Sequence, residues 1–115
     1  MGSKPLTNPH SWDLTPNEAI AVQAHLAGKV IRASGFDIVN VTNVAGVDTH
    51  FHQDLAVAAV VVIRLSDLST VDCATAIRQV RFSYMPGLLT FREGPAVLAA
   101  LNRLTIAPDL LIFDG

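Results

Sequence analysis

The chain has little charge, a single cysteine and no apolar run long enough to cross a bilayer. Only 16% of its 115 residues are charged and 50% are hydrophobic, which excludes a disordered chain and predicts one globular domain over residues 1–115. The longest apolar run, Leu55 to Ile63, ends at Arg64 and is too short to span a membrane. Cys73 stands alone, so it cannot form an internal disulfide.

A strongly basic balance is absent too, since the formal net charge is −2. This argues against a protein that coats nucleic acid through a broad basic surface. It does not exclude a nuclease that contacts nucleic acid over a small area, because bound metal ions neutralise phosphate at a reacting centre. Arg78, Arg81 and Arg92 gather around one aromatic turn and could meet phosphates there; the alternative is that they are ordinary solvated surface arginines. The opening residues hold no basic stretch followed by an apolar core, so we expect no secretion signal and a cytoplasmic location.

The first predicted element is a helix from Pro16 to Ser34. Thr15 is its expected N-cap, Pro16 takes the first helical position, and Glu18 closes a capping box. Gly35 is the expected C-cap. An apolar stripe along this segment predicts that the helix covers a sheet.

Three strands and a second helix follow. Strands are predicted from Val44 to Phe51, from Ala56 to Leu65 with both faces buried, and from Thr70 to Phe82, where a helix is the alternative. Short connections make them an antiparallel meander. A helix from Pro95 to Leu104 and an apolar strand from Leu110 to Phe113 complete the set. This α/β order matches the first part of a ribonuclease H-like fold, whose first and fourth strands lie side by side.

Three carboxylates stand where such a fold would bring them together. Asp48 ends Val44-Ala45-Gly46-Val47-Asp48, Asp114 ends the last strand, and Glu93 stands beside Gly94-Pro95 at the head of a helix. Hard divalent ions prefer carboxylate oxygens, and two such ions can activate water and stabilise the leaving oxygen of a phosphodiester. The ordinary alternatives are two strand-end aspartates facing solvent and a glutamate that meets the helix dipole.

Several segments, taken in order, resemble the endonuclease V family. They are Pro9-His10-Ser11-Trp12, the helix from Gln23 to Val30, Val44-Ala45-Gly46-Val47-Asp48, Phe91-Arg92-Glu93-Gly94-Pro95, and Pro108-Asp109-Leu110-Leu111-Ile112-Phe113-Asp114-Gly115. The resemblance implies that Asp48, Glu93 and Asp114 are catalytic and bind Mg²⁺, with Mn²⁺ as an alternative. It implies a hydrolase that incises DNA at the second phosphodiester 3′ to deoxyinosine, in the repair of deaminated bases. RNA that contains inosine is the alternative substrate.

The aromatic turn resembles the family's Pro-Tyr-Ile-Pro wedge, which enters the duplex beside the damaged base. The matching residues are Ser83-Tyr84-Met85-Pro86, so the resemblance makes Tyr84, Met85 and Pro86 the wedge. Tyr84 would fill the gap that a flipped nucleotide leaves. The alternative is a tyrosine that caps the edge of the core with its hydroxyl in water. By resemblance alone, Gly87, Leu89 and Gly115 line the pocket for the base.

The resemblance covers only the first half of the longer family proteins, so we expect an endonuclease V-like domain that is truncated on its C-terminal side. The last strand would then have an open edge, available for self-association or for a partner. Two further readings stay open: a non-catalytic remnant that binds inosine-containing nucleic acid, and a fragment that does not fold alone. His50 and His52 could hold zinc, but polar residues at a strand end explain them more simply.

Overall fold

A computed structural model describes residues 10–114 of the chain. The predicted order of helix, three strands, helix and strand is confirmed, with one additional 3₁₀ turn before the first strand. The elements are α1 (Pro16–Ala27), η1 (Ile38–Asn40), β1 (Asn43–His52), β2 (Leu55–Arg64), β3 (Thr70–Gln79), α2 (Thr90–Asn102) and β4 (Leu110–Phe113). Within the described residues, no helix is long and apolar enough to cross a membrane.

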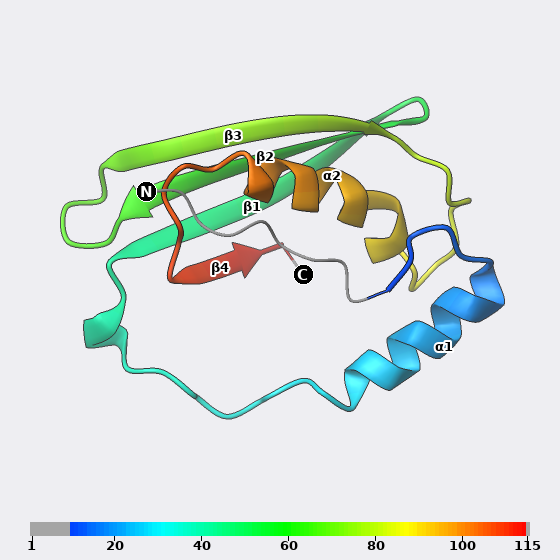
Figure 1. Cartoon of the computed structure of the whole chain (residues 1–115), viewed down its shortest axis with the longest axis horizontal. Helices are drawn as coiled ribbons and strands as arrows, with labels where there is room; N and C mark the ends of the chain where they lie inside the picture. The colour runs from blue at the N-terminus through cyan, green and yellow to red at the C-terminus, as the bar shows by residue number, and fades with distance from the viewer. Residues whose placement is uncertain (1–9, 115) are drawn as a thin grey trace.

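The four strands form one mixed sheet in the order β3-β2-β1-β4 (Figure 1). β1, β2 and β3 pair antiparallel, which confirms the meander, and β4 lies parallel to β1 at the edge. The helical alternative for the third strand is wrong, because Thr70–Gln79 pairs with β2. This strand ends before the predicted Phe82, whose ring is instead buried in a cluster outside the sheet.

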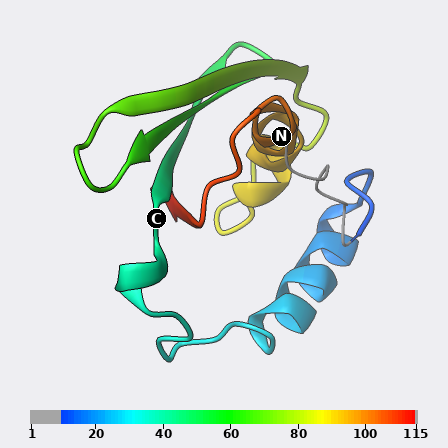
Figure 2. The same ribbon diagram turned by 60° about the vertical axis from the view of Figure 1, so that its left-hand side comes forward.

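The second helix, α2, lies across one face of the sheet (Figure 2). Its small and branched side chains pack mainly against β2 and β3, with Ala45 and Val47 of β1 in the same core, which is a thin layer rich in alanine and valine. The prediction that the second strand is buried on both faces is wrong. Ala58, Val60 and Val62 are fully buried under α2, whereas Val61 on the opposite face is 43% exposed. The strand is apolar throughout, but the described residues cover one of its faces.

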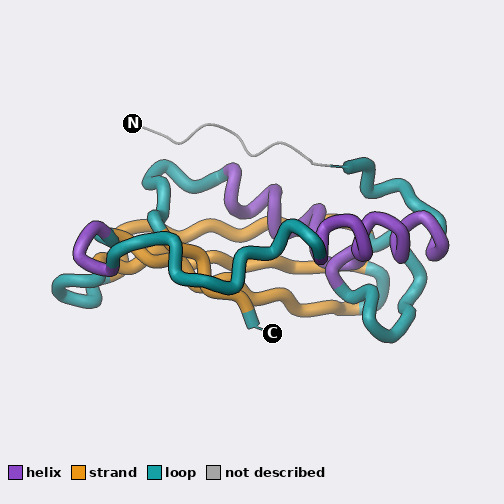
Figure 3. The backbone as a smooth tube through the Cα atoms, turned by 90° about the horizontal axis from the view of Figure 1, so that it is seen from below, coloured by secondary structure: helices purple, strands orange, loops and turns teal. Residues whose placement is uncertain are grey.

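The first helix begins as predicted and ends early, at Ala27 instead of Ser34. Thr15 and Glu18 form the expected capping box. Beyond Gly28 the chain leaves in a wide loop (Figure 3), where Val30 and Ile31 are exposed. Without packing partners there, helix propagation gains no tertiary stabilisation. The expectation that this helix covers a sheet is also wrong, since its buried residue, Ala19, packs in a cluster with Phe82, Leu88 and Phe91.

The helix α2 begins at Thr90, five positions before the predicted start at Pro95. Proline inside a helix removes one backbone donor, and it disfavours helical backbone at the preceding residue through a clash with that residue's Cβ. The preceding residue here is Gly94, which has no Cβ. Gly94 also leaves space for the Trp12 ring, which a Cβ at that position would overlap. Gly94 therefore allows the helix to continue across Pro95.

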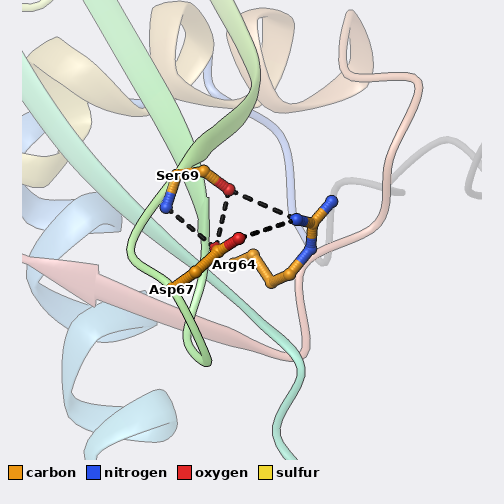
Figure 4. A network of polar contacts seen from close by, with 3 residues as sticks. All are labelled: Arg64, Asp67 and Ser69. Carbon is orange, nitrogen blue, oxygen red and sulfur yellow. Dashed lines mark hydrogen bonds and ion pairs between the residues drawn. The ribbon is translucent and has the colours of Figure 1, made fainter.

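The β2–β3 turn is closed by a polar network (Figure 4). The guanidinium of Arg64 donates to Asp67 Oδ2 at 3.0 Å, and the Ser69 hydroxyl donates to Asp67 Oδ1 at 2.7 Å. These bonds to Ser69 and Arg64 lower the pKa of Asp67. The network fixes the end of the sheet that is remote from the predicted carboxylate site.

Candidate active site

Asp48 and Asp114 are brought together by the parallel pairing of β1 with β4. The register pairs Val44 with Leu110 and Val47 with Phe113. The next position along each strand is therefore Asp48 on β1 and Asp114 just beyond β4. Because both strands run in the same direction, the end of β4 lies beside the middle of β1, where Asp48 stands. Asp48 is therefore not at a strand end, contrary to the expectation from the sequence. The predicted proximity of these two aspartates follows from this register.

Glu93 joins the two aspartates from the first turn of α2. A hollow of about 140 Å³ is lined by all three carboxylate residues. We call it the carboxylate pocket; its remaining lining residues are Val47, Thr49, Phe51, Leu89 and Phe113. The polar groups thus come from two strands and a helix, while apolar side chains form the walls.

The carboxylates of this pocket are available as ligands. Asp48 Oδ1 accepts one hydrogen bond, from the backbone N–H of Thr49 at 2.9 Å. No arginine, lysine or histidine within residues 10–114 forms an ion pair with Asp48, Glu93 or Asp114. An all-oxygen set of this kind suits a hard divalent cation. Across the described residues, however, no three acidic, histidine or cysteine side chains are gathered closely enough to hold a metal ion by themselves.

The aromatic turn presents Tyr84 to solvent. Leu88 N–H donates to Met85 O at 3.1 Å, with Pro86 and Gly87 between them, and Gly87 has a φ of +85°. A left-handed glycine after proline is the signature of a type II turn. Phe82 and Leu88 are buried on either side of the turn, whereas Tyr84 is 65% exposed. Of the predicted wedge, Tyr84 and Pro86 are exposed, and Met85 is half-buried against the Ala19 cluster.

The residues predicted to line a base pocket are only partly brought together. Leu89 lines the carboxylate pocket and is 48% exposed. Gly87 lies in the turn and does not line the carboxylate pocket. Gly115 lies outside the described residues.

A stack of side chains between the turn and the sheet was not predicted from the sequence. The guanidinium carbon of Arg92 lies 5.2 Å from the centre of the Phe51 ring and 5.7 Å from the centre of the Tyr84 ring. A guanidinium at such distances is attracted by both aromatic faces. Its Nε is buried and has no hydrogen-bond partner among the described residues. The available signal was the pair Arg92-Glu93, a cation and an anion at consecutive helical positions.

The element order, the parallel contact between β1 and β4 and the neighbouring positions of Asp48 and Asp114 define an α/β protein with a ribonuclease H-like fold. Solved endonuclease V structures share this fold with the chain. The structure of endonuclease V from Streptomyces avermitilis aligns with a TM-score of 0.81 and 44% identity, over 93% of this chain and 48% of that one. Endonuclease V from Ciona intestinalis, solved with a 24mer DNA that contains an inosine followed by a ribo-adenosine, aligns with a TM-score of 0.75 and 26% identity, over 86% of this chain and 45% of that one.

The chain belongs to the endonuclease V family. The sequence model of the family described as Endonuclease V matches residues 24–115. Endonuclease V from Roseiflexus sp. (strain RS-1) is 48% identical over 104 residues, which cover 90% of this chain and 46% of that protein. The chain thus spans about half the length of the relatives it matches. Proteins of this name are nucleases, that is, phosphodiester hydrolases.

Proposed function

We propose that the chain carries the catalytic carboxylates of a metal-dependent endonuclease that incises DNA at the second phosphodiester 3′ to deoxyinosine, in the repair of deaminated bases. The observation that carries the proposal is the convergence of Asp48, Glu93 and Asp114 on one pocket. A relative solved with inosine-containing DNA supports the choice of substrate. RNA that contains inosine is the alternative substrate. We place this reaction in the cytoplasm.

In this proposal Asp48 and Asp114 hold Mg²⁺ through carboxylate oxygens, and Glu93 adds a third from α2. Mn²⁺ has the same preference for oxygen and would replace it. An ion held by these carboxylates would activate a water and neutralise charge on the leaving oxygen. The water oxygen bonds to phosphorus, the P–O3′ bond breaks, and the departing oxygen takes a proton, which leaves a 3′-hydroxyl and a 5′-phosphate.

The test is incision of a duplex with one inosine, in Mg²⁺, by the chain and its Asp48→Asn variant. We expect incision by the parent and a loss of at least about a hundredfold in Asp48→Asn. Asp37→Asn is the matched control, since Asp37 lies outside the pocket and asparagine also serves as the N-cap of η1. Binding of Mn²⁺ to the same variants gives a second readout that needs no turnover. Equal incision by parent and Asp48→Asn would refute the carboxylate assignment.

Tyr84 is proposed to occupy the gap left by the flipped nucleotide, with Pro86 stiffening the turn. Its exposure and its place beside Arg92 support this role. Tyr84→Ala should lose the preference for inosine over adenine duplexes, whereas Tyr84→Phe should keep it, because stacking needs the ring and not the hydroxyl. Comparison of the two affinities in EDTA measures recognition apart from incision. A Tyr84→Ala variant with unchanged preference would show that this ring does not take part.

A second candidate function is binding of inosine-containing nucleic acid without incision. It is favoured by one observation: the described residues contain no three ligands placed to hold an ion unaided. This candidate predicts inosine-selective binding that needs no Mg²⁺ and yields no nick. The open edge of β4 is proposed as the place where the chain pairs with a second copy or with a partner that completes the site.

A further inference from the structure

A second cavity lies on the other side of α2 from the carboxylates. It has a volume of about 310 Å³ and is formed by the end of β3, the segment after it, the start of α2 and the residues before α1. Three of the chain's six arginines line it: Arg78, Arg81 and Arg92. We call it the arginine pocket. Asp13 is the one acidic residue in its lining, and the rest of the wall includes Trp12 and Phe91.

The arginines of this pocket are not neutralised by acidic partners. Within residues 10–114 the ion pair is that of Arg64 with Asp67, at the far end of the sheet. Arg78 donates to the carbonyl oxygen of Ile77 at 2.8 Å, and Arg81 has no hydrogen-bond or ion-pair partner in the described chain. Positive charges that share one cavity repel each other, and apolar walls focus their field into it. Their concentration in a chain of net charge −2 therefore suits an anionic ligand.

The two pockets are separated by one stack of side chains. Arg92 lines the arginine pocket and Glu93, its neighbour on α2, lines the carboxylate pocket. Between them, the guanidinium of Arg92 contacts the rings of Phe51 and Tyr84. The carboxylate pocket is electronegative and, without metal, repels phosphate, while the arginine pocket attracts it. Arg92 thus joins the Tyr84 ring to the arginine pocket, and its contact with Phe51, which lines the carboxylate pocket, joins the two pockets.

We propose that the arginine pocket is a second phosphate-binding site, which holds the sugar–phosphate backbone on the other side of the Phe51–Arg92 contact from the carboxylates. This inference rests on the proposed function and deepens it. Guanidinium groups bind phosphate oxygens through paired, charge-assisted hydrogen bonds. Contacts of this kind position the strand and carry no base preference. Arg78 and Arg81 hold the phosphate, and Arg92 connects this site to the Tyr84 ring.

The experiment measures binding of a fluorescein-labelled single-stranded oligonucleotide to the chain in EDTA, by anisotropy, over a series of NaCl concentrations. Arg78→Gln and Arg81→Gln should each weaken binding about tenfold, to the same extent for inosine and adenine oligonucleotides. Each should lower the slope of log K against log salt by about 0.7. Arg81→Lys should retain part of the affinity, because it keeps a point charge but loses the planar pair of donors.

Arg32→Gln is the matched control, since Arg32 lies in the exposed loop after α1 and loses the same charge. Thermal unfolding of each variant separates loss of binding from loss of fold. Competition by inorganic phosphate at the affinity of the oligonucleotide would show a site for free phosphate and overturn the assignment to a strand. Arg78→Gln and Arg81→Gln variants that behave as Arg32→Gln, or a parent without salt-dependent binding, would overturn the site itself.

The outcomes also separate this inference from the proposed function. Arginine-dependent binding without inosine preference or nicking would preserve the phosphate site and refute the endonuclease. Incision that depends on Asp48, with the same KM in parent and Arg81→Gln, would preserve the endonuclease and refute the phosphate site.

Discussion

Asp109 Oδ2 accepts a hydrogen bond from the backbone N–H of Asn43 at 3.0 Å, and in return Asp109 N–H donates to Asn43 O at 2.9 Å. The N–H of Thr42 donates to the same carboxylate oxygen at 2.9 Å. This clamp joins the starts of β1 and β4 and fixes Leu110 opposite Val44. Since the register continues to Val47 and Phe113, Asp109 sets the position of Asp114 beside Asp48.

Replacement of Asp109 with alanine should lower the melting temperature by several degrees and weaken Mn²⁺ binding at the carboxylate pocket. It leaves two backbone donors without their acceptor and frees the edge strand. Asp109→Asn is the control, because both donors meet one oxygen that an amide carbonyl can replace. Thermal unfolding and Mn²⁺ titration check both effects. If asparagine were as damaging as alanine, the charge and not the acceptor geometry would hold the clamp.

Stability should fall as the solution is acidified below the ordinary aspartate pKa. Hydrogen bonds from Asn43 and Thr42 lower the pKa of Asp109, and those from Ile106 and Thr105 lower the pKa of Asp72, both from an ordinary value of 3.8. A folded-state pKa below the unfolded one means that the unfolded chain binds more protons in this range. The contribution is therefore complete above pH 3.8 and is lost as the pH falls through the lowered values.

Urea unfolding at a series of pH values, from about pH 6 to about pH 2, measures this loss. Asp109→Asn should show a shallower acid limb than the parent, since the amide does not titrate. An acid limb of equal slope in both proteins would contradict the role of Asp109.

Gly94→Ala should destabilise the chain, although alanine favours helices by about 1 kcal/mol over glycine. The new Cβ would overlap the Trp12 ring, and overpacking of this kind costs about 1–3 kcal/mol. In a Trp12→Ala background the same change should be neutral or stabilising. A double-mutant cycle by urea unfolding measures this sign reversal. Equal effects in both backgrounds would show that the ring is not what Gly94 accommodates.

Leu68→Asn should raise the free energy of unfolding by about 0.5–1 kcal/mol. Leu68 has a φ of +58° in the β2–β3 turn and is 67% exposed, so it carries a left-handed backbone without compensating burial. Asparagine tolerates this conformation. Leu65→Asn removes a similar side chain nearby without relieving such a backbone and should be neutral or destabilising. A shift of the urea midpoint with an unchanged m value would confirm the assignment.

Much of the fold could be predicted from local sequence. Thr15, Pro16 and Glu18 fix the start of α1 by capping alone, and β-branched runs fix the strands. The limits of the helices could not be predicted in this way. Pro95 marks a helix start in most sequences, and only the preceding Gly94, packed under Trp12, lets α2 begin earlier.

The candidate site also has features that could be predicted from the sequence and features that could not. Asp114 follows the last strand and Glu93 lies in the first turn of a helix, and both positions are marked in the sequence. Asp48 lies inside β1, and its place in the same pocket was predicted from the expected pairing of the first and last strands. Which face of β2 is covered depends on where α2 packs. The sequence of β2 is apolar on both faces, so it does not predict which face is left exposed. The stack of Arg92 between Phe51 and Tyr84 could not be predicted, because Phe51 is far from the other two residues in the sequence and no helical or strand periodicity relates the three.

The position of β4 has a thermodynamic consequence. This strand is four residues long, pairs with β1 alone and carries Asp114 at its end. Any ligand that engages Asp48 and Asp114 together also cross-links the margin of the sheet to its centre, so part of its binding free energy is spent on docking the strand. The measured affinity then depends on the fraction of molecules in which β4 is docked as well as on the intrinsic affinity of the docked form. Asp109 touches no ligand and lies at the opposite end of β4 from Asp114. A substitution at Asp109 would therefore lower the affinity for a ligand bound at Asp114 by making the docked strand less populated.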